Sequence, residues 1–342
     1  MRSVVPTALL TIAAATALAQ TGPSGTLVVN NMTDSSATLI DAASGRTVAT
    51  LRTGEGPHEV AISHDGRWAL VSNYGVRGKP GGSLTVIDIA GARVARTIPF
   101  GSLQRPHGSA FLAGDTLAVV TAEAAAAIAV IDIRTGAIVR TLPTGGRLPH
   151  MLGATATGAR IVTGNLGSNT LAVLSAAGRD SARLIPVGRQ PEGVALSHDG
   201  RFAWAGSNAD GVVLVADLER GAVVDTLRNF GLPYRTAISP DDRIAVITDP
   251  VRAEVRVFDA RTRAPKFTVT VPADSVLESA EVKGSPAPEG VAISRDSRWA
   301  FVTLQGRNRV ITIDLESGRI VAWAPSGNWS DGIGYSPVVA TP

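Results

Sequence analysis

The stretch that decides the fold is PHEVAISHDGRWALVSN, residues 57–73. It returns as PEGVALSHDGRFAWAGSN at 191–208 and as PEGVAISRDSRWAFVTLQ at 288–305. Weaker copies start at Pro106, Pro149 and Pro233. The intervals between the six leading prolines are 49, 43, 42, 42 and 55 residues. A period of this kind is typical of a repeat architecture, in which each unit is stabilised by packing against its neighbours.

Each unit is interpreted as four short strands. The quoted stretch supplies two strands joined by an HDG-type turn, because its apolar residues alternate and β-branched residues dominate. An alternating strand that ends in an acid follows, such as SLTVID up to Asp88, and then a fourth strand, such as RVARTI from Arg93. Four antiparallel strands in about 42 residues predict one blade of a β-propeller.

The two chain ends set the number of blades. Residues 26–51 contain TLVVNN, SATLID and TVATL, which match the second, third and fourth strands of a unit. SDGIGYS, from Ser330, matches the missing first strand. We therefore expect an all-β, seven-bladed propeller of four-stranded antiparallel blades, with a ring closed by a blade shared between the N- and C-termini. Such closure removes sheet edges that would otherwise invite aggregation.

The first nineteen residues have the pattern of a signal peptide. Arg2 precedes the apolar run Val4–Ala17, and Ala17-Leu18-Ala19 provides the small residues of a cleavage site. We expect residues 1–19 to be removed and residues 20–342 to form one propeller domain that is periplasmic or secreted. An uncleaved N-terminal anchor is the alternative, although the run is shorter than the ~20 apolar residues of a transmembrane helix. No transmembrane span is therefore expected.

Composition excludes several classes of function. The net charge is only +3, and the basic side chains are scattered, which argues against a nucleic-acid-binding patch. The absence of cysteine excludes disulfides, thiolate metal sites, a cysteine nucleophile and covalently attached haem. No phosphate-binding loop, nucleophile elbow or zinc-protease helix motif occurs. We expect the domain to be a monomer.

The repeat resembles that of a known family. The pattern P-x-G-V-A-(I/L)-S-x-D-G-R, the following (V/I)-D strand and the T-(I/L)-P-x-G exit resemble the YVTN repeat of YncE-like exported bacterial propellers. The resemblance extends from Thr26 to Ser336, although the namesake tetrapeptide is not literal and reads VSNY at Val71. It implies the fold but no single activity, because related propellers include binding proteins, lactonases, lyases and domains of copper or haem enzymes.

Positions at which the copies agree are interpreted as structural. The acids that end the third strands are expected to accept backbone N–H bonds in the following turn; they are Asp41, Asp88, Asp132, Asp217, Asp259 and Asp314. His64 and His198 lie in Ser-His-Asp-Gly turns on the opposite face, where neighbouring residues cannot converge as a catalytic triad. Trp68 and Trp299 share a position that we assign to the core between blades.

Positions at which the copies differ in chemistry identify the candidate site. The residue after each leading proline is expected at the mouth of the central channel, and all seven of these residues can bond to a proton or a metal. They are His58, His107, His150, Glu192, Tyr234, Glu289 and Asp331.

Further polar residues are expected on the same face. The ends of the second strands contribute Asn31, Asn73, Tyr74, Glu123, Asn165, Asn208, Asp249 and Gln305. Arg105, Arg147 and Arg189 precede leading prolines. The two largest insertions, residues 74–82 and 272–287, also connect strands on this face, and long loops on a rigid scaffold commonly carry function.

Three classes of function are compatible with this face. The first is recognition of a small polar ligand, a glycan, or a peptide or protein partner at the channel mouth. The second is a metal-dependent enzyme of the lactonase, lyase or oxidoreductase type, and the third is a scaffold in an envelope assembly.

A metal site at the mouth is the sharpest of these hypotheses. His58, His107 and His150 occupy one slot in three consecutive units, so they are predicted to bind zinc or copper together with Glu192 or Glu289. Alternatively, the histidines line a polar funnel and bond to water, to Glu59, or to an anionic ligand shared with Arg105 and Arg147.

Overall fold

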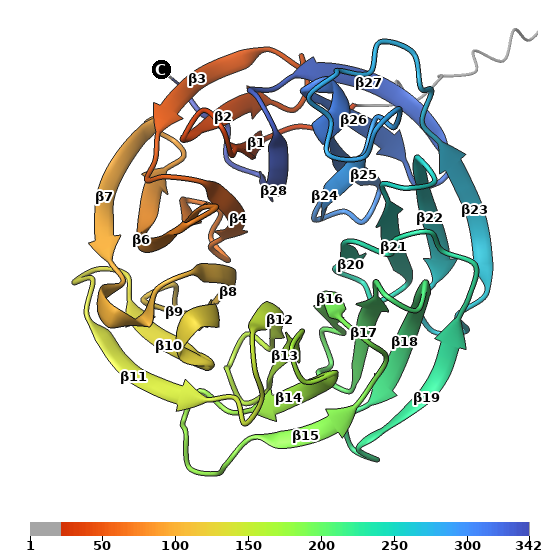
Figure 1. Ribbon diagram of the computed structural model, residues 1–342. Helices are drawn as coiled ribbons and strands as arrows, with labels where there is room; N and C mark the ends of the chain where they lie inside the picture. The colour runs from red at the N-terminus through yellow and green to blue at the C-terminus, as the bar shows by residue number, and fades with distance from the viewer. Residues whose placement is uncertain (1–21, 342) are drawn as a thin grey trace, which may run out of the picture.

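The computed structural model describes residues 22–341, so the predicted signal peptide and its cleavage site lie outside the described residues. The chain forms seven four-stranded antiparallel sheets arranged as blades around a central axis, which confirms the predicted seven-bladed propeller (Figure 1). Within the described residues, no helix has the length and apolarity needed to cross a bilayer.

Each blade is built in order from its innermost to its outermost strand. Blade 1 contains β28 (Ser330–Ser336), β1 (Thr26–Asn31), β2 (Ser36–Asp41) and β3 (Thr47–Arg52). Blade 2 contains β4 (Pro57–Ile62), β5 (Trp68–Val76), β6 (Lys79–Asp88) and β7 (Arg93–Pro99). Blade 3 contains β8 (Pro106–Phe111), β9 (Leu117–Ala122), β10 (Ala127–Asp132) and β11 (Ile138–Pro143). Blade 4 contains β12 (Pro149–Ala154), β13 (Ile161–Asn165), β14 (Thr170–Leu174) and β15 (Arg183–Pro186).

The other three blades complete the ring. Blade 5 contains β16 (Pro191–Leu196), β17 (Phe202–Ser207), β18 (Val212–Asp217) and β19 (Ala222–Leu227). Blade 6 contains β20 (Thr236–Ile238), β21 (Ile244–Asp249), β22 (Glu254–Asp259) and β23 (Pro265–Thr270). Blade 7 contains β24 (Pro288–Ile293), β25 (Trp299–Leu304), β26 (Arg309–Asp314) and β27 (Arg319–Pro325). Residues 22–341 also contain three single-turn 3-10 helices, which are η1 (Gly101–Leu103), η2 (Glu123–Ala125) and η3 (Gln305–Arg307).

Blade 1 joins the two ends of the chain, as the sequence predicts. β28 pairs antiparallel with β1, with Thr26 opposite Ser336 and Val29 opposite Ile333. The chain after β28 also docks on the ring, because the Ala340 N–H donates to Thr26 Oγ1 at 2.9 Å. Backbone pairing and side-chain contacts both therefore close the ring.

Apolar layers between adjacent blades hold the ring together. Leu70 and Leu84 of blade 2 pack with Phe111 and Val120 of blade 3, and each of these four side chains is buried. Equivalent clusters join the other neighbours, including blades 7 and 1. Because each blade buries apolar residues against its neighbours, stability depends on an unbroken ring.

The predicted structural turns are present. Asp132 accepts the Thr135 N–H at 2.9 Å, and Gly136 in the same turn has a φ of 80°, a conformation that favours glycine. Asp41, Asp217, Asp259 and Asp314 accept equivalent backbone bonds. Asp88 differs, since its carboxylate accepts a hydrogen bond from Arg93 at 2.6 Å.

The two histidines assigned to the opposite face link neighbouring blades. His64 Nδ1 lies 2.8 Å from Asp115 Oδ1, and His198 Nδ1 lies 3.0 Å from Asp242 Oδ1. In each pair the aspartate also accepts the histidine's backbone N–H and belongs to the next blade. His198 is more than half exposed. Both histidines therefore have the structural role that the sequence predicts.

Candidate functional site

The innermost strands β4, β8, β12, β16, β20, β24 and β28 surround the axis of the ring (Figure 1). Hydrogen bonds between blades position three of the residues at their starts. Threonine hydroxyls on second strands donate to the backbone carbonyls of His150, Glu289 and Asp331 in the next blade, at 2.8, 2.7 and 2.7 Å. The donors are Thr121, Thr248 and Thr303. The backbone at the channel mouth is thus fixed by the scaffold, so its side chains are presented from a rigid frame.

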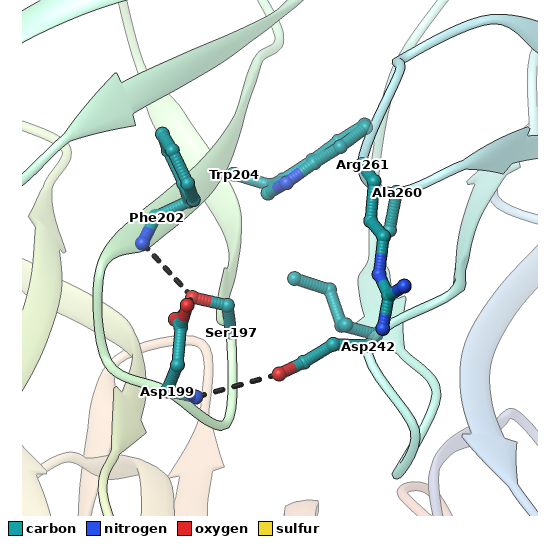
Figure 2. Close-up of a pocket in the computed structure, with 8 residues that line it drawn as sticks. Ser197, Asp199, Phe202, Trp204, Asp242, Ala260 and Arg261 are labelled. Carbon is teal, nitrogen blue, oxygen red and sulfur yellow. Dashed lines mark hydrogen bonds between the residues drawn. The ribbon is translucent and has the colours of Figure 1, made fainter.

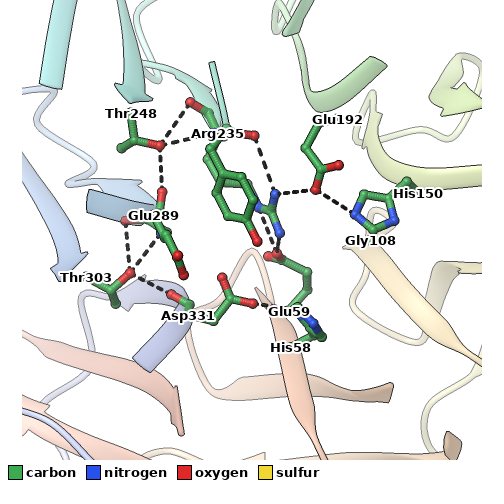
Figure 3. Close-up of polar contacts among 12 residues, drawn as sticks. His58, Glu59, Gly108, His150, Glu192, Arg235, Thr248, Glu289, Thr303 and Asp331 are labelled. Atoms are coloured by element: carbon green, nitrogen blue, oxygen red, sulfur yellow. Dashed lines mark hydrogen bonds and ion pairs between the residues drawn. The ribbon is translucent and has the colours of Figure 1, made fainter. Parts of the chain in front are cut away.

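Eight side chains near the axis form what we call the axial cluster, and Figure 3 labels all of them but His107. Its members are His58, Glu59, His107, His150, Glu192, Arg235, Glu289 and Asp331. At its centre, the guanidinium of Arg235 from blade 6 donates to Glu59 Oε1 of blade 2, with an Nε to Oε1 distance of 2.8 Å. Arg235 also donates to Glu192 Oε1 of blade 5 at 3.0 Å. One cation therefore joins two carboxylates from separate blades.

The network continues from Glu192 into blades 4 and 3. His150 Nε2 lies 2.7 Å from Glu192 Oε1, and His150 Nδ1 lies 3.0 Å from Glu123 Oε1. Burial lowers the pKa of His150, but the two carboxylates outweigh burial and raise it to about 9. Burial raises the pKa of Glu192, but His150 and Arg235 outweigh it and hold that pKa at about 2. His150 is therefore an imidazolium at neutral pH, and both of its N–H groups donate to carboxylates.

Blade 2 and the loop before β8 complete this side of the site. Tyr74 OH donates to Glu123 Oε2 at 2.5 Å, and Arg105 Nε lies 3.0 Å from the same oxygen. The Arg105 guanidinium also lies over the Tyr74 ring, 4.3 Å from its centroid, in a cation–π contact. Tyr74 and Arg105 therefore adjoin the axial cluster through Glu123.

His107 is the exception in this well-paired region. Its side chain is fully buried, and neither ring nitrogen has a hydrogen-bond partner among the described residues. The ring stacks on His150 with centroids 3.6 Å apart, and it lies 4.9 Å from the His58 ring. Burial, with the positive charge of His150 next in size, lowers the pKa of His107 well below its usual value. The site thus holds a neutral imidazole with two unused nitrogens.

His58 and two acids form the other side of the cluster. His58 Nδ1 contacts the carboxylate of Asp331, whose side chain is fully buried. Burial raises the pKa of Asp331, but His58 and Arg235 outweigh burial and lower it. The buried Glu289 carboxyl makes no hydrogen bond or ion pair with any of the described residues, and burial followed by the nearby Asp331 raises its pKa well above the usual value. Glu59 also has a raised pKa because burial outweighs its contact with Arg235.

Three of these residues are arranged so that they could hold a metal ion. One potential ligand atom from each of His58, Glu59 and His107 lies within 4.8 Å of the other two. His150, Glu192 and Glu289 are not part of this group, and both nitrogens of His150 are bonded to carboxylates. All three predicted histidines therefore lie side by side, but the group of potential ligand atoms contains Glu59 instead of His150. Metal binding itself stays a prediction.

Several predicted rim residues bond within the scaffold. The Asn73 amide donates to Ser83 and Thr85 of its own blade, and the Asn165 amide donates to Thr170. Asp249 accepts the Gly231 and Leu232 N–H groups and thereby fixes the chain before β20.

Other predicted residues make contacts outside the axial cluster. Arg147 donates to the Gly167 carbonyl, and Arg189 pairs with Asp210. Asn208 donates its backbone N–H to Gln190. Tyr234 lies beside Arg235, whose guanidinium is 4.2 Å from the ring centroid. Tyr234 therefore adjoins the cluster.

Arg235 was missed by sequence reasoning, and Glu59 was considered only as a neighbour of the histidines. The sequence did offer a clue, which is the residue immediately after each of the seven positions expected at the channel mouth. Four copies have glycine there, where a Cβ would meet backbone of the next blade: Gly108, Gly193, Gly290 and Gly332. Among the remaining three copies, only Glu59 and Arg235 carry charge. Those two residues form the central ion pair.

A separate hollow of about 360 Å³ lies between blades 5 and 6 near the opposite face (Figure 2). Ser197 Oγ accepts the Phe202 N–H at 2.9 Å, and Asp242 accepts the Asp199 N–H at 3.4 Å. In contrast to His107, none of the residues that line this hollow has a buried side-chain polar atom without a hydrogen-bond partner, so the axial cluster is the stronger candidate site.

Comparison with known proteins supports the fold. No family model matches the chain, and no curated protein matches its sequence. Among solved structures, it is similar to hydrazine synthase of Kuenenia stuttgartiensis, with a TM-score of 0.67 and 18% identity over 82% of this chain and 90% of that one.

Two further structures show the same similarity. The chain resembles a functionally unknown protein from Desulfotomaculum acetoxidans, with a TM-score of 0.73 and 14% identity over 92% and 99% of the two chains. It also resembles the dihydro-heme d1 dehydrogenase NirN, with a TM-score of 0.61 and 18% identity over 92% of this chain and 75% of that one. At these identities the similarity shows a shared propeller fold alone.

Proposed function

We propose that this chain is a binding protein of the periplasm or extracellular space, whose axial cluster takes a small polar ligand that carries positive charge. The observation that supports binding most directly is His107. A buried polar group without a partner costs about 1–3 kcal/mol, so two such nitrogens on one imidazole are expected where a ligand completes the site.

The charges around His107 set the sign of the ligand. Five carboxyl groups gather here, against two arginines and the protonated His150. The acids are Glu59, Glu123, Glu192, Glu289 and Asp331. The raised pKa values of Glu59 and Glu289 reflect burial and neighbouring acids, and a bound cation would relieve this repulsion. Two of the similar structures are named as enzymes, but their low identity carries no activity to this chain.

Thermal unfolding with defined probes tests this proposal. Zinc chloride, choline and putrescine serve as cationic probes, and phosphate serves as the anionic control. At least one cation should raise the Tm in a saturable way, because a ligand that binds only the folded state stabilises it. His107→Leu should abolish the shift, whereas His198→Gln on the opposite face should retain it. The absence of any cation-dependent shift, or a larger shift with phosphate, would refute the proposal.

A further inference from the structure

The strongest feature beyond a general cation preference is the arrangement of His58, Glu59 and His107. We infer that these three side chains bind a divalent transition-metal ion of the zinc class, which rests on the proposed function and names its ligand. Two imidazoles and one carboxylate form a donor set that zinc uses with a fourth position open. Hard cations such as Mg²⁺ and Ca²⁺ prefer sites made only of oxygen ligands.

His58 and Glu59 each have one side-chain atom that contacts a neighbouring residue and a second atom that is available to a metal. His58 Nδ1 faces Asp331, which leaves Nε2 for a metal. Glu59 Oε1 accepts both hydrogen bonds from Arg235, which leaves Oε2. A carboxylate behind a metal-binding histidine fixes the ring and raises its basicity, and ligating carboxylates are commonly hydrogen-bonded in the same way. Asp331 and Arg235 are therefore assigned as positioning residues.

His107 provides the independent observation. It is fully buried, neutral and unpartnered, and one of its nitrogens lies within 4.8 Å of the ligand atoms of the other two residues. Zinc bonds of ~2.0–2.1 Å in a tetrahedral site place ligand atoms about 3.4 Å apart, so closure requires side-chain movements of about an ångström. The stacked His150 carries positive charge, but Glu123 and Glu192 flank it and offset its repulsion of a metal.

The position of the ion also determines which side stays accessible. The His58 side chain is 15% exposed and the Glu59 side chain 10%, whereas His107 is fully buried. The fourth coordination position is therefore assigned to the side away from His107, where water or a small ligand could reach the metal. A site with three protein ligands and an open position differs from a structural zinc site, which is closed by four.

Direct metal binding tests this inference. Untagged protein is stripped with EDTA, dialysed and titrated calorimetrically with zinc sulfate. A second metal-free sample is loaded with cobalt(II), which gives a visible spectrum. One equivalent of zinc should bind to the first sample, and in the second it should displace the cobalt and abolish its spectrum. His107→Leu should abolish this equivalent, and Asp331→Asn should weaken it about 10–100-fold. The matched control His198→Gln should bind as the parent does.

The outcomes separate this inference from the proposed function. No stoichiometric zinc binding, or binding that is unchanged in both His107→Leu and Asp331→Asn, overturns the metal site and marks any bound zinc as adventitious. If choline or putrescine still raises the Tm through His107, the cation-binding function stands without the metal. If His107→Leu does not fold, Asp331→Asn and the cobalt spectrum of the parent decide the question.

Discussion

Arg235 and Glu59 meet across the axis of the propeller, although 176 residues separate them in the chain. Both are buried, and the guanidinium also holds Glu192. Burial lowers the pKa of Arg235, but Glu59 and the other acidic groups outweigh it and raise that pKa well above its usual value. This cation therefore stays charged and connects blades 2, 5 and 6, which adds an axial link to the contacts between adjacent blades.

Replacement of Arg235 should destabilise the whole ring. Arg235→Met leaves Glu59 and Glu192 buried without their cation, and breaking a buried ion pair in this way costs ~3–5 kcal/mol. The free energy of unfolding from urea denaturation should fall by that amount. A double variant, Arg235→Met with Glu59→Gln, should recover part of it because it removes one uncompensated charge. A loss below about 1 kcal/mol in the single variant would show that the pair contributes little.

The His150–Glu192 pair predicts how stability depends on pH. Glu192 has a folded pKa of about 2 against a usual 4.5, so its contribution is present above pH 4.5 and is lost as the pH falls through about 2. His150 has a folded pKa of about 9 against a usual 6.5, so its contribution is complete below pH 6.5 and is lost as the pH rises through about 9. Glu123, Arg235 and His107 also face this pair.

Denaturation of the parent and Glu192→Gln across this range measures the effect. In EDTA, the difference in unfolding free energy between the two proteins should be largest between pH 4.5 and 6.5. It should shrink towards about pH 2, where Glu192 is protonated, and above about pH 9, where His150 is neutral. A difference that stays constant from about pH 3 to about pH 10 would contradict the assigned ionisation states.

His107 should cost stability in the absence of a ligand. His107→Leu replaces two buried unpartnered nitrogens with an apolar group, which relieves a desolvation penalty of about 1–3 kcal/mol. In urea denaturation, we expect the free energy of unfolding of the metal-free variant to equal or exceed that of the metal-free parent. A marked loss of stability under these conditions would mean that the imidazole already has a structural role.

The repeat made the fold predictable. The side-chain contacts of the site, however, form between residues of different blades and depend on how those blades are placed around the axis. The slot after each leading proline places His58 and His107 beside each other, because equivalent positions in a repeat occupy equivalent places around a ring. Which carboxylate each imidazole faces depends on side-chain rotamers and on the curvature of the ring. The copies do not encode these relations, so the pairing of His150 with Glu123 and Glu192 could not be read from the repeat.

The rim residues show a second limit. Asn165 ends β13 and Asn73 lies three residues before the end of β5, but their amides bond to hydroxyls of the neighbouring strand in the same blade. Strand position alone shows which end of the blade a residue occupies. Whether its side chain turns towards the axis or back into the sheet depends on local partners such as Ser83 and Thr170, which a comparison of leading prolines does not consider.

Closure of the ring by the C-terminal strand gives the last prediction. Deletion of residues 330–342 removes β28, exposes the hydrogen-bonding edge of β1 and takes Asp331 from the axial cluster. This variant should aggregate or lose cooperative unfolding. Deletion of residues 337–342 is the matched control: it removes the docked tail but keeps β28, so unfolding should stay cooperative with a lower Tm. If both truncations unfold alike, the stability of the ring does not depend on the shared blade.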